Sequence, residues 1–207
     1  MDRSARLGPG ASPLRLGQPP APGLPIWIAA LGEHSLRVAA ELGDAWIPAL
    51  VPRDSLPGMA DKLCEIRQAA APDAPPLTVA AGPLTAVADD AGTARGIAAS
   101  CVAWYLTAMG DVYASSVSRR GYAAEVKAII AANPRPSPRR GTVPASAEPV
   151  LGQLAAYGTA DQVRAQLKTW DDVADVVTVM LPPGLPWTAI EATLRAAASP
   201  GAPDIAA

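Results

Sequence analysis

The chain has 207 residues, half of them apolar, and its seventeen basic residues nearly balance nineteen acidic ones. This length predicts one compact domain, and the apolar content is sufficient for a core and argues against intrinsic disorder. The net charge of -2 excludes a strong electrostatic footprint for nucleic acid or an anionic membrane. Twenty-three prolines predict many stiff connections, because proline is confined to loops and the ends of elements.

Two cysteines, Cys64 and Cys101, are too few for a disulfide framework or a cysteine-based zinc site. Both fall within apolar helical patterns, so we expect buried, reduced thiols. The sequence shows no signal peptide, and no apolar stretch reaches the roughly 20 residues of a membrane-spanning helix. These features predict a soluble, cytoplasmic protein that uses neither a membrane nor a metal.

The N-terminal part predicts strands alternating with a helix. Residues 1–23 are rich in proline and glycine and are expected to form an extended arm. The apolar run over 24–31 predicts a strand buried on both faces, as in parallel sheets. A helix over 33–43 follows, and a second strand is predicted over 45–51. Pro48 indicates that this strand bends or lies at a sheet edge, because proline removes a ladder donor.

The middle of the chain predicts a third strand and then only helices. A longer helix is expected over 54–71, and the third strand over 77–81 continues weakly past Gly82-Pro83 to Val87. No strand is predicted in the following stretch, which contains a helix over 120–132. The next strand is the β-branched run over 175–181.

The C-terminal part is bounded by a helix start and a tail. Thr159 and Gln162 form a capping-box pattern, which predicts that a helix begins there. A last helix is expected over 187–198, followed by a tail over 199–207. The folded domain is therefore predicted to span residues 24–198.

The alternation of strands and helices predicts an α/β fold with parallel strands and right-handed crossovers. Four strands are half of the eight that close a (β/α) barrel. We therefore expect a partial, half TIM-type barrel with a helical insertion before the last strand. An open half-barrel exposes two sheet edges and an apolar inner face, which favour association, so we expect an oligomer.

Several segments resemble the luciferase-like monooxygenase family. The runs Leu24–Gly32 and Leu36–Trp46 are similar to the fifth strand of these proteins and the helix behind it. Arg120–Val126 and Tyr157–Arg164 are similar to later family motifs, and Asp175–Leu181 to the eighth strand. The matches occur in family order but cover only the C-terminal half of a member. The resemblance implies a barrel oxidoreductase that uses FMN or a 5-deazaflavin coenzyme (F-420).

The resemblance also implies a position for the coenzyme phosphate. In the family, the turn after the fifth strand and the following helix N-terminus help to hold it, since free backbone N–H groups and the helix dipole favour an anion. Glu33 departs from the family pattern, because its carboxylate would compete with a phosphate; the plain alternative is an ordinary turn and helix start. The implied cofactor-binding residues are Ala30, Leu31, Gly32, His34 and Ser35.

No catalytic residue is identified from the sequence. The half of the family barrel that usually supplies the acid/base residue is not matched. His34 is the only histidine, and it is either catalytic or a solvent-facing residue of a first helical turn. Four aromatic residues could wall an apolar pocket or pack in the core: Trp27, Trp46, Trp104 and Tyr105. No nucleophile–base pair, P-loop, metal-ligand spacing or aromatic–basic nucleic-acid pattern is visible.

Three functions follow from these observations. The first is a subunit of a flavin- or deazaflavin-dependent oxidoreductase or monooxygenase that acts on a small organic substrate, in specialised metabolism. The second is a non-catalytic partner that stabilises a catalytic luciferase-like homologue. The third is a cofactor-free pocket that folds a reactive substrate, as in a cyclisation. In each case the expected partner is a second copy of the chain or a luciferase-like homologue in a heterodimer.

Overall fold

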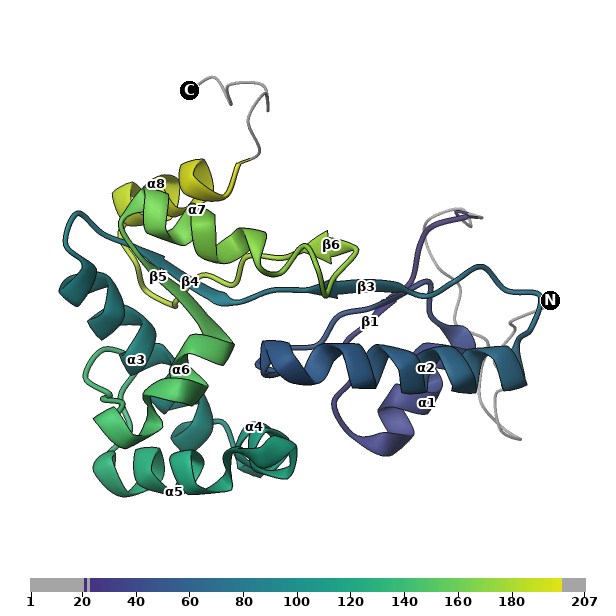
Figure 1. Ribbon diagram of the computed structural model, residues 1–207, viewed down its shortest axis with the longest axis horizontal. Helices are drawn as coiled ribbons and strands as arrows, with labels where there is room; N and C mark the ends of the chain where they lie inside the picture. The colour runs from purple at the N-terminus through teal and green to yellow at the C-terminus, as the bar shows by residue number, and fades with distance from the viewer. Residues whose placement is uncertain (1–20, 22, 199–207) are drawn as a thin grey trace, which may run out of the picture.

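The computed structural model describes residue 21 and residues 23–198 (Figure 1). The predicted arm over 1–23 lies almost wholly outside these described residues, as does the predicted tail over 199–207. The chain begins with three strands, two helices and a short 3-10 helix: β1 (Trp27–Ile28), α1 (Glu33–Leu42), β2 (Ala45–Trp46), η1 (Arg53–Ser55), α2 (Leu56–Ala70) and β3 (Thr78–Ala81).

The second part of the chain is mostly helical. Helices α4 and α5 are joined by a π-helical segment, η2, which is kinked where the backbone at Arg120 and Gly121 is not helical. The elements are β4 (Leu84–Val87), α3 (Ala91–Ala108), α4 (Asp111–Val117), η2 (Ser118–Tyr122), α5 (Ala123–Ala132), η3 (Ala145–Ala147), α6 (Glu148–Leu154), β5 (Ala155–Gly158), α7 (Ala160–Lys168), β6 (Val176–Val177) and α8 (Trp187–Ala197). Figure 1 shows two lobes, one with α1 and α2 and the other with α3 to α8.

The sheet confirms the predicted fold class. Four strands in the order β1-β2-β3-β6 form an open sheet, and every pair in it is parallel. The register places Trp27 opposite Ala45 and Ala80 opposite Val176. Strands β4 and β5 form a second, two-stranded parallel sheet. The described residues therefore form an open half-barrel rather than a closed ring.

One extended segment, residues 78–87, runs through both lobes as β3 and then β4 (Figure 1). The segment after β6 follows it across the break at Gly82-Pro83. The N–H of Met180 donates to the Pro83 carbonyl at 3.1 Å, and the N–H of Thr85 donates to the Met180 carbonyl at 2.8 Å. The weak continuation to Val87 predicted from the sequence is confirmed.

A glycine is required where these two segments cross. A Cβ atom at Gly82 would lie 1.7 Å from the carbonyl oxygen of Thr178, which is backbone and cannot rotate away. The close approach lets the Thr178 N–H donate to the Ala81 carbonyl at 3.0 Å. The ladder between β3 and the β6 segment therefore depends on the missing side chain.

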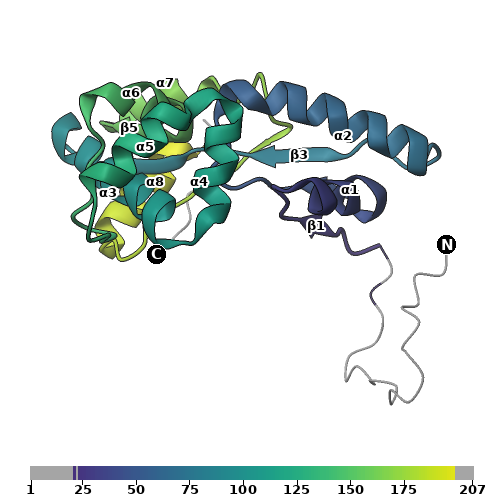
Figure 2. The ribbon, with the colours of Figure 1, turned by 90° about the horizontal axis from the view of Figure 1, so that it is seen from below.

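The core of the first lobe lies between the sheet and its two helices. Ile28, Trp46 and Val79 share one face of the sheet and pack in a cluster with side chains of α1 and α2. Figure 2 shows α1 and α2 side by side with β3 visible between them. The Trp46 indole is fully buried, and its N–H donates to the Ala30 carbonyl at 2.9 Å. This bond satisfies the one polar group of the largest core side chain.

Two sequence predictions about strands are wrong. The run over 24–31 is a strand only at Trp27–Ile28, and the Trp27 side chain is 47% exposed rather than buried. Successive strand residues face opposite sides of a sheet, so Trp27 faces away from the helices that cover Ile28. Strand β5 (Ala155–Gly158) was not predicted, because Ala155-Ala156 are poor strand formers and tertiary pairing with β4 determines their conformation.

Two smaller predictions also need correction. Strand β2 is central, not at an edge, and it ends at Trp46, so that Pro48 removes no ladder donor. Cys101 is buried and burial raises the pKa of its thiol to about 12, but Cys64 is exposed on the outer face of α2. The predicted helix start is confirmed, since the Gln162 side chain accepts a hydrogen bond from the Thr159 N–H at 2.9 Å.

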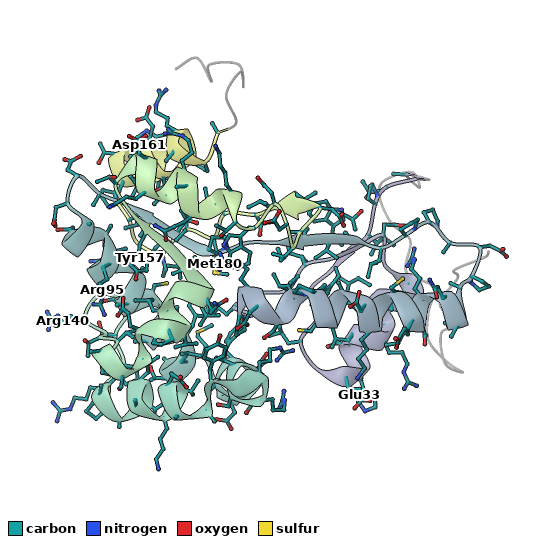
Figure 3. The ribbon with its side chains drawn as sticks, viewed as in Figure 1. Glu33, Arg95, Arg140, Tyr157, Asp161 and Met180 are labelled. Atoms are coloured by element: carbon teal, nitrogen blue, oxygen red, sulfur yellow. The ribbon has the colours of Figure 1, made fainter. Side chains whose placement is uncertain are left out.

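A polar cluster joins three elements of the second lobe. Arg95 of α3 forms an ion pair with Glu148 of α6, and the Tyr157 hydroxyl of β5 donates to Glu148 Oε1 at 2.8 Å. Figure 3 shows Arg95 and Tyr157 close together. Arg95 and the Tyr157 hydroxyl lower the pKa of Glu148, whereas burial and the carboxylate raise the pKa of Tyr157 to about 12. These two pKa shifts indicate that the contact between Arg95, Glu148 and Tyr157 is more stable when the Glu148 carboxylate is charged.

The crossing at residue 82 predicts a large difference between two glycine substitutions. Gly82→Ala should lower the free energy of unfolding by about 3 kcal/mol, because the methyl group collides with backbone. Gly96→Ala is the control, since no atom lies within 4 Å of the new methyl group in α3, and it should stabilise by about 0.5 kcal/mol. Urea denaturation measures both; equal effects would contradict the proposed crossing.

The Glu148 cluster predicts a pH-dependent contribution to stability. A carboxyl whose pKa is lowered by folding stabilises above its ordinary value, and this contribution disappears as pH falls through the folded-state pKa. Glu148→Gln should therefore lower the urea midpoint at pH 7, and the difference from the wild type should shrink below about pH 4.5. Asp161→Asn removes an almost fully exposed carboxylate from a surface ion pair with Arg164; it is the control and should have little effect at either pH. A pH-independent difference for Glu148→Gln would contradict the assignment.

Candidate functional site

The candidate site lies at the edge of the sheet where the parallel strands β1 and β2 end. Helix α1 begins five residues after β1, and η1 with α2 follows the end of β2. Because neighbouring parallel strands end on the same side, the N-termini of α1 and α2 are brought to one edge. In (β/α) barrels this is the face that carries active sites.

The first turn of α1 leaves backbone donors available. Ser35 Oγ accepts from the Gly32 N–H at 3.2 Å and donates to the Gly32 carbonyl at 2.9 Å, which fixes the turn before the helix. The first intrahelical bond is donated by Leu36 to the Gly32 carbonyl at 2.9 Å. The N–H groups of the residues between them have no intrahelical acceptor and point along the positive end of the helix dipole. This turn can hold an anion.

The residues implied by the resemblance divide into two groups. Ala30 is buried and its carbonyl accepts from Trp46, while Leu31 packs on the core of the first lobe. Gly32 and His34 are exposed, and Ser35 is half-buried at the turn. The structure therefore places Gly32, His34 and Ser35 at the surface of the helix start, where they can contact a ligand.

Glu33 lies in the same first turn of α1 and is exposed (Figure 3). A carboxylate in the first turn stabilises a helix by interacting with its dipole. It also places a negative charge beside the donors that would hold a phosphate, as expected from the sequence.

A π-helical segment brings further residues to this edge. The Tyr122 hydroxyl donates to the Asp54 carboxylate of η1, and the Asp54 N–H donates to Gln153 Oε1 at 3.1 Å. Burial, and then the Asp54 contact, raise the pKa of Tyr122 to about 12. Gly121 permits the kink with a φ of +98°.

Sequence reasoning identified the run Arg120–Val126 as a family motif but not its contacts with α2. No local pattern links residue 122 to residue 54, since the two are brought together only by the packing of η2 on η1. No local sequence pattern predicts the backbone of Leu50 either, which adopts a φ of +52° after β2. Its buried side chain packs in the core of the second lobe, which holds this strained backbone in place.

The four aromatic residues do not form one pocket wall. Trp46 is in the core of the first lobe, and Trp27 is exposed at the β1 edge. Trp104 and Tyr105 belong to α3 in the second lobe, with an edge-to-face contact between their rings at a centroid distance of 5.2 Å. The packing interpretation of the sequence therefore holds for Trp46.

The described residues contain no cluster of three or more histidine, cysteine or acidic side chains that could hold a metal ion. Within the same part of the chain, none of the helices has the length and apolar character needed to cross a bilayer.

Comparison with solved structures gives the fold. The coenzyme F420 dependent tetrahydromethanopterin reductase from Methanopyrus kandleri superimposes with a TM-score of 0.56 at 16% sequence identity, over 81% of this chain and 48% of that one. An EDTA monooxygenase from Chelativorans sp. BNC1 has 16% identity, 79% and 40% coverage and a TM-score of 0.45. The monooxygenase RslO1 from Streptomyces bottropensis has 18% identity, 82% and 44% coverage and a TM-score of 0.44.

This chain thus spans about half the length of the structures that it matches. No curated protein sequence matches it significantly. The sequence profile of the luciferase-like monooxygenase family matches residues 9–175, which is most of the chain. The match includes β1, the start of α1 and the π-helical segment described above. The chain belongs to the luciferase-like monooxygenase family.

Proposed function

We propose that this chain is a subunit of a flavin- or deazaflavin-dependent oxidoreductase that acts on a small organic substrate of specialised metabolism. The start of α1 carries the proposal. It lies at the carboxyl edge of the parallel sheet, and its first turn has backbone donors suited to a phosphate. Membership of the family supports the redox chemistry, and the F420 named for the Methanopyrus kandleri reductase supports the deazaflavin option.

The residues at the α1 turn fit the phosphate end of such a coenzyme. Gly32, His34 and Ser35 would contact it, while Ala30 and Leu31 support the turn from the core. A bound flavin would supply hydride transfer or oxygen activation, and the protein would bind, orient and shield it. The two free thiols are compatible with a reducing compartment, and we propose the cytoplasm.

A second candidate function is a non-catalytic partner of a catalytic homologue. The exposed carboxylate of Glu33 favours it, because that charge opposes a phosphate at the α1 turn. The half-length match to related structures also favours it, since the remaining strands would come from elsewhere. The cofactor-free pocket gains no support, because the candidate aromatic residues are divided between the two lobes.

We also propose that the chain works in an assembly, as a homo-oligomer or with a luciferase-like homologue. Large apolar side chains are exposed on both edge strands of the sheet and on two helices. Along β1 and α1 they are Leu24, Ile26, Trp27, Val38 and Leu42, and along β6 and α8 they are Val176, Trp187 and Leu194. In a closed barrel these edges would be paired and covered.

Coenzyme binding tests the proposed function. The fluorescence of FMN should be quenched when the protein binds it. FMN should also bind about tenfold more tightly than riboflavin, because only FMN carries the phosphate. Ser35→Asp keeps an acceptor at the turn but adds a negative charge, so it should weaken the binding of FMN and leave the binding of riboflavin unchanged. Ser146→Asp, on an exposed residue of η3, is the control. No binding of FMN or a 5-deazaflavin, alone or with the co-purifying partner, would favour the non-catalytic alternative.

Light scattering after size exclusion tests the assembly. The expected mass is at least twice the 21.1 kDa of one chain. Trp27→Glu, at the open β1 edge, should shift the chain toward the monomer, whereas Val112→Glu, exposed on α4 far from both edges, should not. A folded monomer that purifies alone from its native host would overturn the proposal.

A further inference from the structure

A cavity of about 280 Å³ lies between α1 and α2, and the π-helical segment closes one side of it. Its floor is apolar and is formed by Leu36, Leu63 and Ile66. Three cationic side chains line it, each from a different element: Arg37 of α1, Lys62 of α2 and Arg120 of η2. The only acidic lining residue is Glu33.

Arg120 is held in place rather than free in solvent. Its Nη1 donates to the Ser116 carbonyl at 2.6 Å and to Ser116 Oγ at 2.7 Å, and its Nε contacts Met59 Sδ at 3.1 Å. The side chain is half-buried, and burial together with the neighbouring Arg119 lowers the pKa of its guanidinium. Among the residues that the structure describes, no carboxylate forms an ion pair with this fixed cation.

The lining cations are not neutralised by the protein. The ion pairs among the described residues involve Arg95, Arg164 and Arg195, and none of them lines this cavity. Glu33 lies beyond ion-pair distance of all three lining cations. Long basic side chains on a surface are often merely solvated, but here one is fixed, and all three surround a concave apolar floor. A low-dielectric floor strengthens attraction for an anion above it.

We propose that this cavity binds a phosphate group, with Arg120 as its fixed ligand and Lys62 and Arg37 as charged arms. Because Arg120 Nε and Nη1 already donate to Met59 and Ser116, its Nη2 would donate to the phosphate, and the Lys62 ammonium would contribute a mobile point charge. The site adjoins the α1 turn at Glu33 but is formed mainly by other residues, since Arg37 lies one turn further along α1 and Lys62 and Arg120 belong to α2 and η2. The inference therefore goes beyond the proposed function and holds whether or not the chain binds a flavin.

Calorimetric titration of the full chain with inorganic phosphate, at low ionic strength, tests the site. Arg120→Gln and Lys62→Gln should each weaken phosphate binding about tenfold, since each removes a charged hydrogen-bond donor. Glu33→Gln should tighten it severalfold, because the variant removes the opposing charge. Lys62 is exposed on α2, so its variant tests the site even where loss of Arg120 disturbs the fold.

Arg119→Gln is the matched control, because it removes the same charge from the adjacent exposed position, which does not line the cavity. Its phosphate affinity should equal that of the wild type. Absence of phosphate binding, binding unchanged by Arg120→Gln and Lys62→Gln, or an equal loss in Arg119→Gln would each overturn the site.

The phosphate can belong to the coenzyme or to a separate ligand, and a competition experiment distinguishes the two sources. If inorganic phosphate displaces FMN and Arg120→Gln weakens FMN but not riboflavin, the coenzyme tail occupies the cavity. If phosphate binds equally with and without FMN, the site serves a second phosphorylated ligand. Phosphate binding that depends on Arg120 in a chain without flavin affinity would support this site and refute the proposed function.

Discussion

The two lobes of this protein depend on one ladder of backbone hydrogen bonds along residues 78–87. The segment is bonded to β2 and then β5 on one side, and to the β6 segment on the other. Gly82 makes this possible by letting the Thr178 backbone approach where a side chain would collide. The same ladder fixes the direction of the neighbouring strands. Because all are parallel, it also determines which edge of the sheet carries the helix starts.

The arrangement at that edge combines two features that are far apart in the sequence. The first turn of α1 presents backbone donors, and the π-helical segment contacts η1 through Tyr122 and α2 through Arg120. An open turn and a fixed cation are both suited to anions. The carboxylate of Glu33 belongs to the α1 turn, lines the same cavity as Arg120 and opposes the same ligand. The balance between these charges determines whether the edge binds a phosphate strongly.

The open sheet explains the distribution of exposed apolar side chains. A (β/α) barrel covers both faces of every strand and leaves no edge. Here β1 and β6 remain at the edges, and the Trp27 side chain of β1 is 47% exposed. Burial of one such side chain is favourable by about 2 kcal/mol. Association of this exposed apolar surface with a second subunit would bury it, which favours an assembly.

The sequence by itself determined the parallel α/β pattern, the half-barrel strand number, the capped helix at Thr159 and the family resemblance, because each depends on local periodicity or short motifs. It also pointed to the turn at Gly32–Ser35. Only the tertiary structure decided that Ala155–Gly158 is a strand, that Trp27 is exposed, that Tyr122 contacts η1 and that Arg120 contacts α2. These features depend on pairing and packing between residues about 20 to 70 positions apart, which no local pattern records.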